Sequence, residues 1–190
     1  MKLLYFDNYR LGVLNGDTVV DVSSVAEDIP HIGPHDLISG LIERFDRYRA
    51  RLEEAAARGG AVPIGTVRIR PPLPRPGNLD CMALNYTEEG TRSEPAPINA
   101  FLKSSNGIVG NDDNMVLPDV PATVFEGEAE VAVVMGRRAA NVRAAEAMDY
   151  IFGYCNFRRV GARPAANRQH VLPNEVPRDV CTHRTVLGDR

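Results

Sequence analysis

Three glutamates occupy alternate positions in the segment FEGEAEVAVVMG, and this is the most chemically informative pattern in the chain: Glu126, Glu128 and Glu130. Residues two apart in a β-strand point to the same face, so the spacing predicts that these carboxylates converge. Carboxylates gathered beside an apolar strand repel one another and lose hydration, and a hard cation among them relieves both penalties. The pattern suggests a magnesium, manganese or calcium site. The alternative is that the glutamates simply lie in solvent at the start of a strand.

Other residues could act beside such a site. Lys103 ends the apolar segment AFLK, where its charge could neutralise a substrate carboxylate or a developing enolate oxygen. Asn85, Tyr86 and Glu89 follow a predicted strand, on a loop of the kind that often faces ligands. The alternatives are that Lys103 is merely exposed to solvent and that the loop residues merely form a turn. The sequence contains no glycine-rich phosphate loop, G-x-S-x-G elbow or C-x-x-C pair, which argues against nucleotide binding and serine hydrolase chemistry.

The elements that must position these residues are short strands, one long helix, and a short helix that Asn141 could cap and that ends at Gly153. Apolar alternation predicts an antiparallel unit between residues 1 and 24. Apolar residues at spacings of three and four predict a single amphipathic helix from Asp36 to Gly59 and Gly60. Five prolines between residues 62 and 77 exclude a regular helix or a central strand, so we place a domain boundary there.

Further strands are expected at 78–84, 100–103 and 123–136, which makes the chain a β-rich member of the α+β class. Val131 to Met135 run without a polar residue. Such a run is typical of a strand that is covered on both faces.

Composition excludes several classes of protein. The 190 residues are 44% hydrophobic and 25% charged, as expected for an ordinary globular protein, and the formal charge of -3 gives no general attraction to nucleic acid or anionic lipid. No apolar run approaches the roughly 20 residues of a membrane span, and the N-terminus has no secretory core. Three widely spaced cysteines suit neither a disulfide framework nor a zinc site. We therefore expect a cytoplasmic protein without nucleic-acid or membrane partners.

The last 33 residues differ from the rest. Residues 158–190 hold seven arginines, no lysine and three acids, a balance of +4, whereas residues 1–157 carry -7. This tail lacks Phe, Tyr, Ile and Met, so it is poorly suited to building a core. We expect a small N-terminal domain with its linker at 1–72, a second domain at 73–157 and a disordered basic tail at 158–190. A basic arm that binds RNA or an acidic partner is the alternative for the tail.

Four motifs in the middle of the chain resemble the fumarylacetoacetate hydrolase superfamily, in the family's order: RPGNLDCMALNY, INAFLKSSNGIVG, LPDVPATVFEGEAEVAVVMG and AEAMDYIFGYCNF. They extend over about residues 74–157. The resemblance implies a mixed β-roll catalytic domain, here only its first part, and a homodimer in the complete protein. It also implies a divalent cation, commonly magnesium, and small 2-oxo or 1,3-dioxo acid substrates.

The resemblance assigns roles to individual residues. The family's metal-binding pair falls on Glu128 and Glu130, its substrate-facing lysine on Lys103, and its substrate loop on Asn85 and Tyr86. Many hydrolases of the family then have a histidine that activates water. This chain has Glu89 in that region, which could act as a base if burial raised its pKa.

The chain departs from the family after Phe157. The family continues with an aspartate that is the third metal ligand, whereas this chain has Arg158 and Arg159. We therefore expect an incomplete cation site with an arginine charge nearby and poor metal affinity. Shifting the reading frame of the tail, with suitable synonymous codons, restores an aspartate at residue 158 and a K-S-x-E-T-F-A-P-I-G-P stretch. The tail is therefore hypothesised to be an out-of-frame translation.

The resulting functional prediction is a divalent-metal-dependent hydrolase of C-C bonds in 2-oxo or 1,3-dioxo acids, incomplete in this chain. The alternatives are a 2-oxo-enoic acid hydratase or a 2-hydroxymuconate-type isomerase on the same fold, an inactive fragment, and a binding module that uses the basic tail.

Overall fold

The computed structural model describes residues 1–83, 94, 97–117, 119, 122–164 and 187–189. Its strands are β1 (Lys2–Phe6), β2 (Arg10–Asn15), β3 (Thr18–Asp21), β4 (Ala61–Pro63), β5 (Ile69–Arg70), β6 (Asp80–Ala83), β7 (Asn99–Leu102), β8 (Ala122–Met135), β9 (Ile151–Pro164) and β10 (Leu187–Asp189). Its α-helices are α1 (Pro34–Glu43) and α2 (Phe45–Arg58), and its 3₁₀-helices are η1 (Ser23–Ala26), η2 (Ile64–Thr66), η3 (Ser105–Gly107) and η4 (Ala144–Tyr150).

Most strands of this part of the chain join one sheet, in the order β4-β3-β2-β1-β10-β9-β8, with β5 as a further partner of β1. Strands β6 and β7 form a separate antiparallel pair. The β-rich α+β class is therefore confirmed. None of the helices in the described ranges is both long enough and apolar enough to span a membrane.

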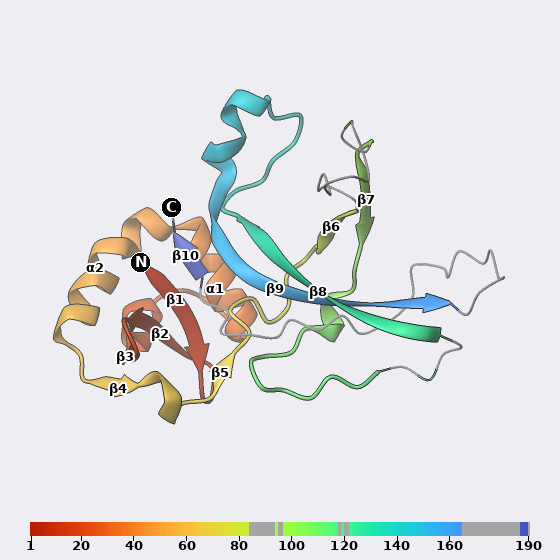
Figure 1. Ribbon diagram of the computed structural model, residues 1–190. Coiled ribbons are helices and arrows are strands. Elements are labelled where there is room, and N and C mark those ends of the chain that lie inside the picture. Colours follow the sequence, from red (N-terminus) through yellow and green to blue (C-terminus); the bar gives the residue numbers. More distant parts are fainter. Residues whose placement is uncertain (84–93, 95–96, 118, 120–121, 165–186, 190) are drawn as a thin grey trace.

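Residues 1–70, called the N-terminal body below, hold the best-packed part of the molecule. Strands β1, β2 and β3 pair as the predicted antiparallel unit. Helices α1 and α2 pack on one face of it, where Leu3, Tyr5 and Leu41 share a core (Figure 1). Leu4 and Val19 belong to a second, smaller cluster. Successive side chains of β1 point alternately into these two clusters, which explains why four of its five side chains are buried.

The single helix expected after Asp36 is wrong. The structure has two helices with a break at Arg44, whose backbone angles, φ -120° and ψ 20°, are not helical. The N–H of Arg44 donates to the carbonyl of Leu41 at 3.2 Å, which closes a tighter turn than the α-helix. The apolar series nevertheless stays on the buried side of both helices, because Phe45 and Leu52 are buried as Leu41 is.

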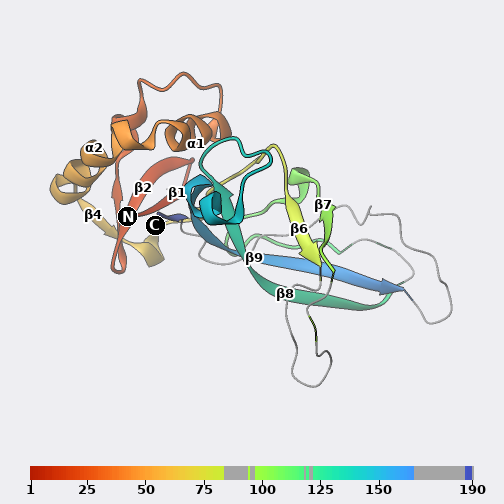
Figure 2. The same ribbon diagram turned by 90° about the horizontal axis from the view of Figure 1, so that it is seen from above.

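Strands β8 and β9 form a long antiparallel ribbon, called the β8–β9 ribbon below, which extends away from the N-terminal body (Figures 1 and 2). Its near end is joined to that body by β10, which pairs with both β9 and β1. Phe152 at the start of β9 packs edge-on against Phe45 of α2, with ring centroids 4.9 Å apart. The ribbon is therefore anchored at one end.

The expectation that residues 131–135 are covered on both faces is wrong. Val131, Val133 and Met135 are 62%, 50% and 48% exposed, whereas Val134 is buried in the core. The run is apolar, but the described residues cover only the face that carries Val134. Sequence hydrophobicity alone does not reveal which face a neighbour covers.

The expected disorder of the tail also differs from the structure in its first residues. Residues 158–164 continue β9 and pair with β8 throughout. A strand needs backbone hydrogen bonds from a neighbour rather than a core of its own, and β8 supplies them. Residues 165–186 lie outside the described ranges.

Candidate active site on the β8–β9 ribbon

Glu128 and Glu130 lie on one face of β8, as their spacing predicts. In the antiparallel register Glu128 stands opposite Arg159, and Glu130 stands opposite Phe157. Both carboxylates contact the same side chain, that of Arg159. Their predicted convergence is therefore present, with a guanidinium between them.

Arg159 bonds to the two glutamates through different nitrogens. Its Nη2 forms an ion pair with Oε2 of Glu128, and its Nε donates to Oε1 of Glu130 at 2.9 Å. The side chain of Arg159 is 19% exposed, compared with 43% for Glu128 and 24% for Glu130. Burial lowers the pKa of Arg159, but the hydrogen bonds and charges of both glutamates outweigh burial and raise it overall. The guanidinium therefore stays charged between the carboxylates.

Lys103 lies directly after β7, close to the same cluster. Its Nζ is 5.7 Å from the ring centroid of Phe101, and Cζ of Arg159 is 5.5 Å from that ring. Both distances fall within the range of cation–π attraction. Strand β7 thus places the predicted substrate lysine against the same aromatic ring as Arg159, the partner of the acidic pair.

Three predicted site residues lie outside the described ranges: Asn85, Tyr86 and Glu89. The strand before them was predicted, and β6 is found there. Their roles stay predictions.

The described residues do not fit a divalent cation in this arrangement. One oxygen of each carboxylate, Oε2 of Glu128 and Oε1 of Glu130, is bonded to Arg159. A guanidinium at that position would also repel a second positive charge. Within the described part of the chain, no group of three or more His, Cys, Asp or Glu side chains is arranged to hold a metal ion. The expectation of an arginine charge near an incomplete site is met by Arg159.

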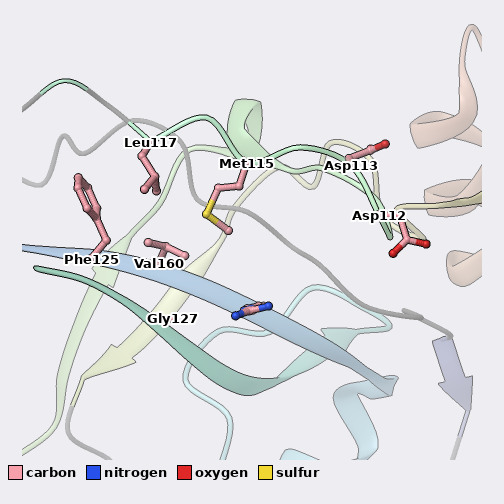
Figure 3. A pocket seen from close by; sticks show the side chains of 8 residues that line it. Asp112, Asp113, Met115, Leu117, Phe125, Gly127 and Val160 are labelled. Carbon is pink, nitrogen blue, oxygen red and sulfur yellow. The ribbon is translucent and has the colours of Figure 1, made fainter.

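A cavity of about 440 Å³ lies on the other face of the ribbon. Phe125 and Gly127 of β8, with Arg158 and Val160 of β9, contribute to its wall, and strand alternation places them opposite Glu128. Figure 3 shows Phe125, Leu117 and Val160 gathered at one side of the ribbon, with Asp112 and Asp113 farther along. This cavity therefore lies away from the face that carries Glu128 and Glu130.

Sequence reasoning expected an arginine charge but assigned Arg159 to a disordered tail. The missing signal was the pairing of FEGEAEVAVVMG with IFGYCNFRRV, which aligns Arg159 with Glu128. In an antiparallel pair, directly opposed residues share a face, so opposite charges at those positions attract. Only one of the two adjacent arginines can face the glutamates, and the register selects Arg159.

Comparison with known proteins assigns the chain to a family. The model of the fumarylacetoacetate (FAA) hydrolase C-terminal domain matches residues 79–188, which is more than half of the chain. The match includes the strand pair that carries Glu128 and Arg159 and continues past Phe157. The chain belongs to the fumarylacetoacetate hydrolase family.

Enzymes are among its relatives. Maleylpyruvate hydrolase of Aquipseudomonas alcaligenes is 28% identical over 82% of this chain and 59% of its own length. Oxaloacetate tautomerase Fahd2a of Rattus norvegicus is 34% identical over 78% of this chain and 47% of its own. A crystal structure of maleylpyruvate hydrolase from Sphingobium sp. SYK-6, in complex with manganese(II) and pyruvate, superimposes with a TM-score of 0.81 at 25% identity, covering 100% of this chain and 67% of that one.

The chain spans about half to two thirds of the length of these relatives. Their names cover hydrolase and tautomerase activities, and a further relative from Escherichia coli is a homoprotocatechuate catabolism bifunctional isomerase/decarboxylase. The family is therefore one of enzymes, with more than one reaction among the members that this chain resembles.

Proposed function

We propose that this chain carries part of a divalent-metal-dependent hydrolase that cleaves C-C bonds in 2-oxo or 1,3-dioxo acids. The proposal rests on the cluster at the junction of β7, β8 and β9, where Lys103 and Arg159 flank Phe101 beside the acidic pair. Cations beside an apolar ring suit a small organic acid, because the charges attract its carboxylate while the ring contacts its carbon chain. Similarity to maleylpyruvate hydrolase over 82% of the chain supports an acid of the maleylpyruvate type.

The reaction balances without an oxidant or reductant. Water adds to the carbonyl carbon beside the bond that breaks, and the electron pair of that bond leaves as the enolate of a 2-oxo acid. A proton from the water ends on the enolate carbon, so the products are one carboxylic acid and one 2-oxo acid. Lys103 would stabilise the substrate carboxylate or the developing enolate oxygen with its positive charge.

The remaining assignments come from the family resemblance. Asn85 and Tyr86 are proposed to bind the substrate, and Glu89 to take a proton from water. Glu128 and Glu130 are proposed as two ligands of a magnesium, manganese or calcium ion in a complete site, supported by the manganese(II) and pyruvate of the Sphingobium relative. In this chain Arg159 holds one oxygen of each of those glutamates.

The test is release of pyruvate from maleylpyruvate, coupled to lactate dehydrogenase and NADH, in the presence of Mn²⁺ or Mg²⁺. In whichever of the unmutated chain and Arg159→Ala releases pyruvate, Lys103→Ala should reduce turnover by about 10²-fold or more, the range for loss of one transition-state charge contact. The chain has only one other lysine, the exposed Lys2 on β1, so Lys2→Ala is a matched control that should leave turnover unchanged.

Two results would reject the proposal. One is the absence of pyruvate release by both the unmutated chain and Arg159→Ala, which would support an inactive fragment. The other is equal turnover by Lys103→Ala and Lys2→Ala, which would remove Lys103 from the site.

An isomerase or tautomerase activity is the second candidate, supported by 34% identity to oxaloacetate tautomerase over 78% of the chain. Tautomerisation transfers a proton and breaks no C-C bond. Decay of the enol absorbance of oxaloacetate, faster than the spontaneous rate and without pyruvate release from maleylpyruvate, would favour this activity.

The domain limits and the reading frame of the tail are further proposals. If residues 158–190 are read out of frame, the coding DNA will encode the aspartate and the K-S-x-E-T-F-A-P-I-G-P stretch in the shifted frame. An intact frame without that sequence would reject the hypothesis. Homodimerisation of the complete protein and a cytoplasmic location stay predictions.

A further inference from the structure

Arg159 occupies the centre of the acidic pair rather than its edge. Its Nη2 and Nε contact one oxygen of each glutamate, and its side chain is less exposed than either of them. A planar guanidinium can serve two carboxylates at once in this way, because its donors diverge in a fixed fork. The two glutamates thus already have a shared positive partner.

The opposite face of β9 provides an internal comparison. Arg158, the preceding residue, points away from the glutamates and lies over Gly127, with its Nη2 3.3 Å from where a Cβ would stand. Arg158 and Arg159 therefore have the same chemistry on the same strand, but the strand register places Arg159 on the face of Glu128 and Glu130 and Arg158 on the opposite face. Replacing Arg159 should therefore change any property that depends on the acidic pair, whereas replacing Arg158 should not.

Gly161 leaves room for the guanidinium on the acidic face. A Cβ placed on it would be 3.7 Å from Nη1 of Arg159 and 3.8 Å from Oε1 of Glu128. Both are ordinary contact distances, so the ion pair lies directly beside Gly161 without being crowded by it. The arrangement is thus supported by the strand register and by two charge-assisted contacts.

We propose that Arg159 is the built-in counter-cation of Glu128 and Glu130, and that it excludes a divalent cation by placing its charge between them and holding one oxygen of each carboxylate. In this chain the acidic pair would then be neutralised by Arg159, whereas the Sphingobium relative was solved with manganese(II). The inference rests on the proposed function only for the identity of the competing cation. It concerns cation binding and does not require turnover.

The experiment is titration of the chain with Mn²⁺, followed by the electron paramagnetic resonance signal of the free ion and by calorimetry. The unmutated chain and Arg158→Ala should bind Mn²⁺ equally weakly. Arg159→Ala should bind it at least about tenfold more tightly, because the competing charge is gone and both carboxylates are released. Adding Glu128→Gln to Arg159→Ala should abolish that gain.

If Arg159→Ala fails to fold, as judged by far-ultraviolet circular dichroism, Arg159→Gln replaces it. Glutamine removes the charge but can still donate to one carboxylate, so a smaller gain in the same direction is expected. The inference is overturned if the unmutated chain binds Mn²⁺ as tightly as the Arg159 variant, if the variant gains nothing over Arg158→Ala, or if its gain survives Glu128→Gln.

These outcomes are independent of the proposed function. Mn²⁺ binding as expected, without pyruvate release by any variant, rejects the hydrolase and keeps the counter-cation. Pyruvate release by an unmutated chain that binds Mn²⁺ tightly through Glu128 rejects the counter-cation and keeps the hydrolase.

Discussion

In β1 of the N-terminal body four of five side chains are buried, whereas along residues 124–135 of β8 only Val134 is. The two strands belong to the same sheet, yet their surroundings differ. Helices cover β1, while β8 is paired along its length with β9 and carries exposed valines. The body is therefore held by packing, and the ribbon by its hydrogen-bond ladder and its ion pairs.

This difference assigns separate roles to the two regions. Apolar burial is non-directional and stabilises the body as a whole, but it does not orient charged groups. Charge-assisted contacts such as those of Arg159 have fixed geometry, which suits a site. We expect changes in the body to alter the free energy of unfolding and changes at the ribbon's far end to alter binding.

The largest effect is expected where the two regions meet. Phe152→Ala should lower the free energy of unfolding by about 3–5 kcal/mol, because it removes a buried ring and leaves a cavity against Phe45. Urea unfolding measures the change. A double-mutant cycle with Phe45→Ala should give a coupling of about 0.5–1.5 kcal/mol from the edge-on ring contact.

Phe125→Ala on β8 is the matched control, since that ring is only half-buried in the open cavity. It should cost clearly less than Phe152→Ala. Equal costs would mean that Phe152 does not anchor the ribbon.

A pair of valines tests the packing difference directly. Val19→Ala in β3 should cost about 2–3 kcal/mol, because its side chain is fully buried. Val131→Ala in β8 should change stability by no more than about 0.5 kcal/mol, because that side chain is 62% exposed. A cost of more than about 1 kcal/mol at Val131 would indicate that something covers its face in solution.

Two strand glycines give a smaller and more local contrast. A Cβ on Gly12 would stand 2.7 Å from Cγ1 of Val19, so Gly12→Ala should destabilise the body by about 1–3 kcal/mol through overpacking. A Cβ on Gly161 would meet Arg159 only at ordinary contact distance. Gly161→Ala should therefore stay within about 0.5 kcal/mol. Thermal unfolding of both variants measures the two losses of stability. A larger loss for Gly161→Ala than for Gly12→Ala would contradict the prediction.

The local parts of the fold were predictable from the sequence. Strands β1 to β3 follow from apolar alternation and a turn at Gly16, whose φ of 58° suits glycine. The break at Arg44 was not predictable in this way, because the apolar period continues through it from Leu41 to Phe45. Periodicity reports which face is buried and is insensitive to a single non-helical residue.

The candidate site was predictable only in part, because its assembly is non-local. The spacing of Glu128 and Glu130 fixed their common face, and the resemblance indicated Lys103. The role of Arg159 depends on a cross-strand register that brings together residues 31 positions apart in the chain. A tail with little apolar content can still complete a strand when a partner strand supplies its hydrogen bonds.

The smallest expected effect concerns Cys155, at the anchored end of the ribbon. Burial raises the pKa of its thiol from 9.0 to about 11. Between these values the unfolded chain loses the thiol proton while the folded chain keeps it, so the unfolded state binds fewer protons. The stabilisation is thus complete below pH 9 and falls as the pH rises towards 11. One pH unit above 9 the loss should be about 1 kcal/mol.

Urea unfolding across this pH range measures the slope, with Cys155→Ala as the reference. Burial also raises the pKa of Tyr5 in the N-terminal body, so some loss of stability with rising pH persists in the variant. The difference between the two proteins isolates the thiol. Identical slopes would mean that water reaches Cys155 in the folded chain. Residue 155 of β9 would then lie outside the core that the N-terminal body forms.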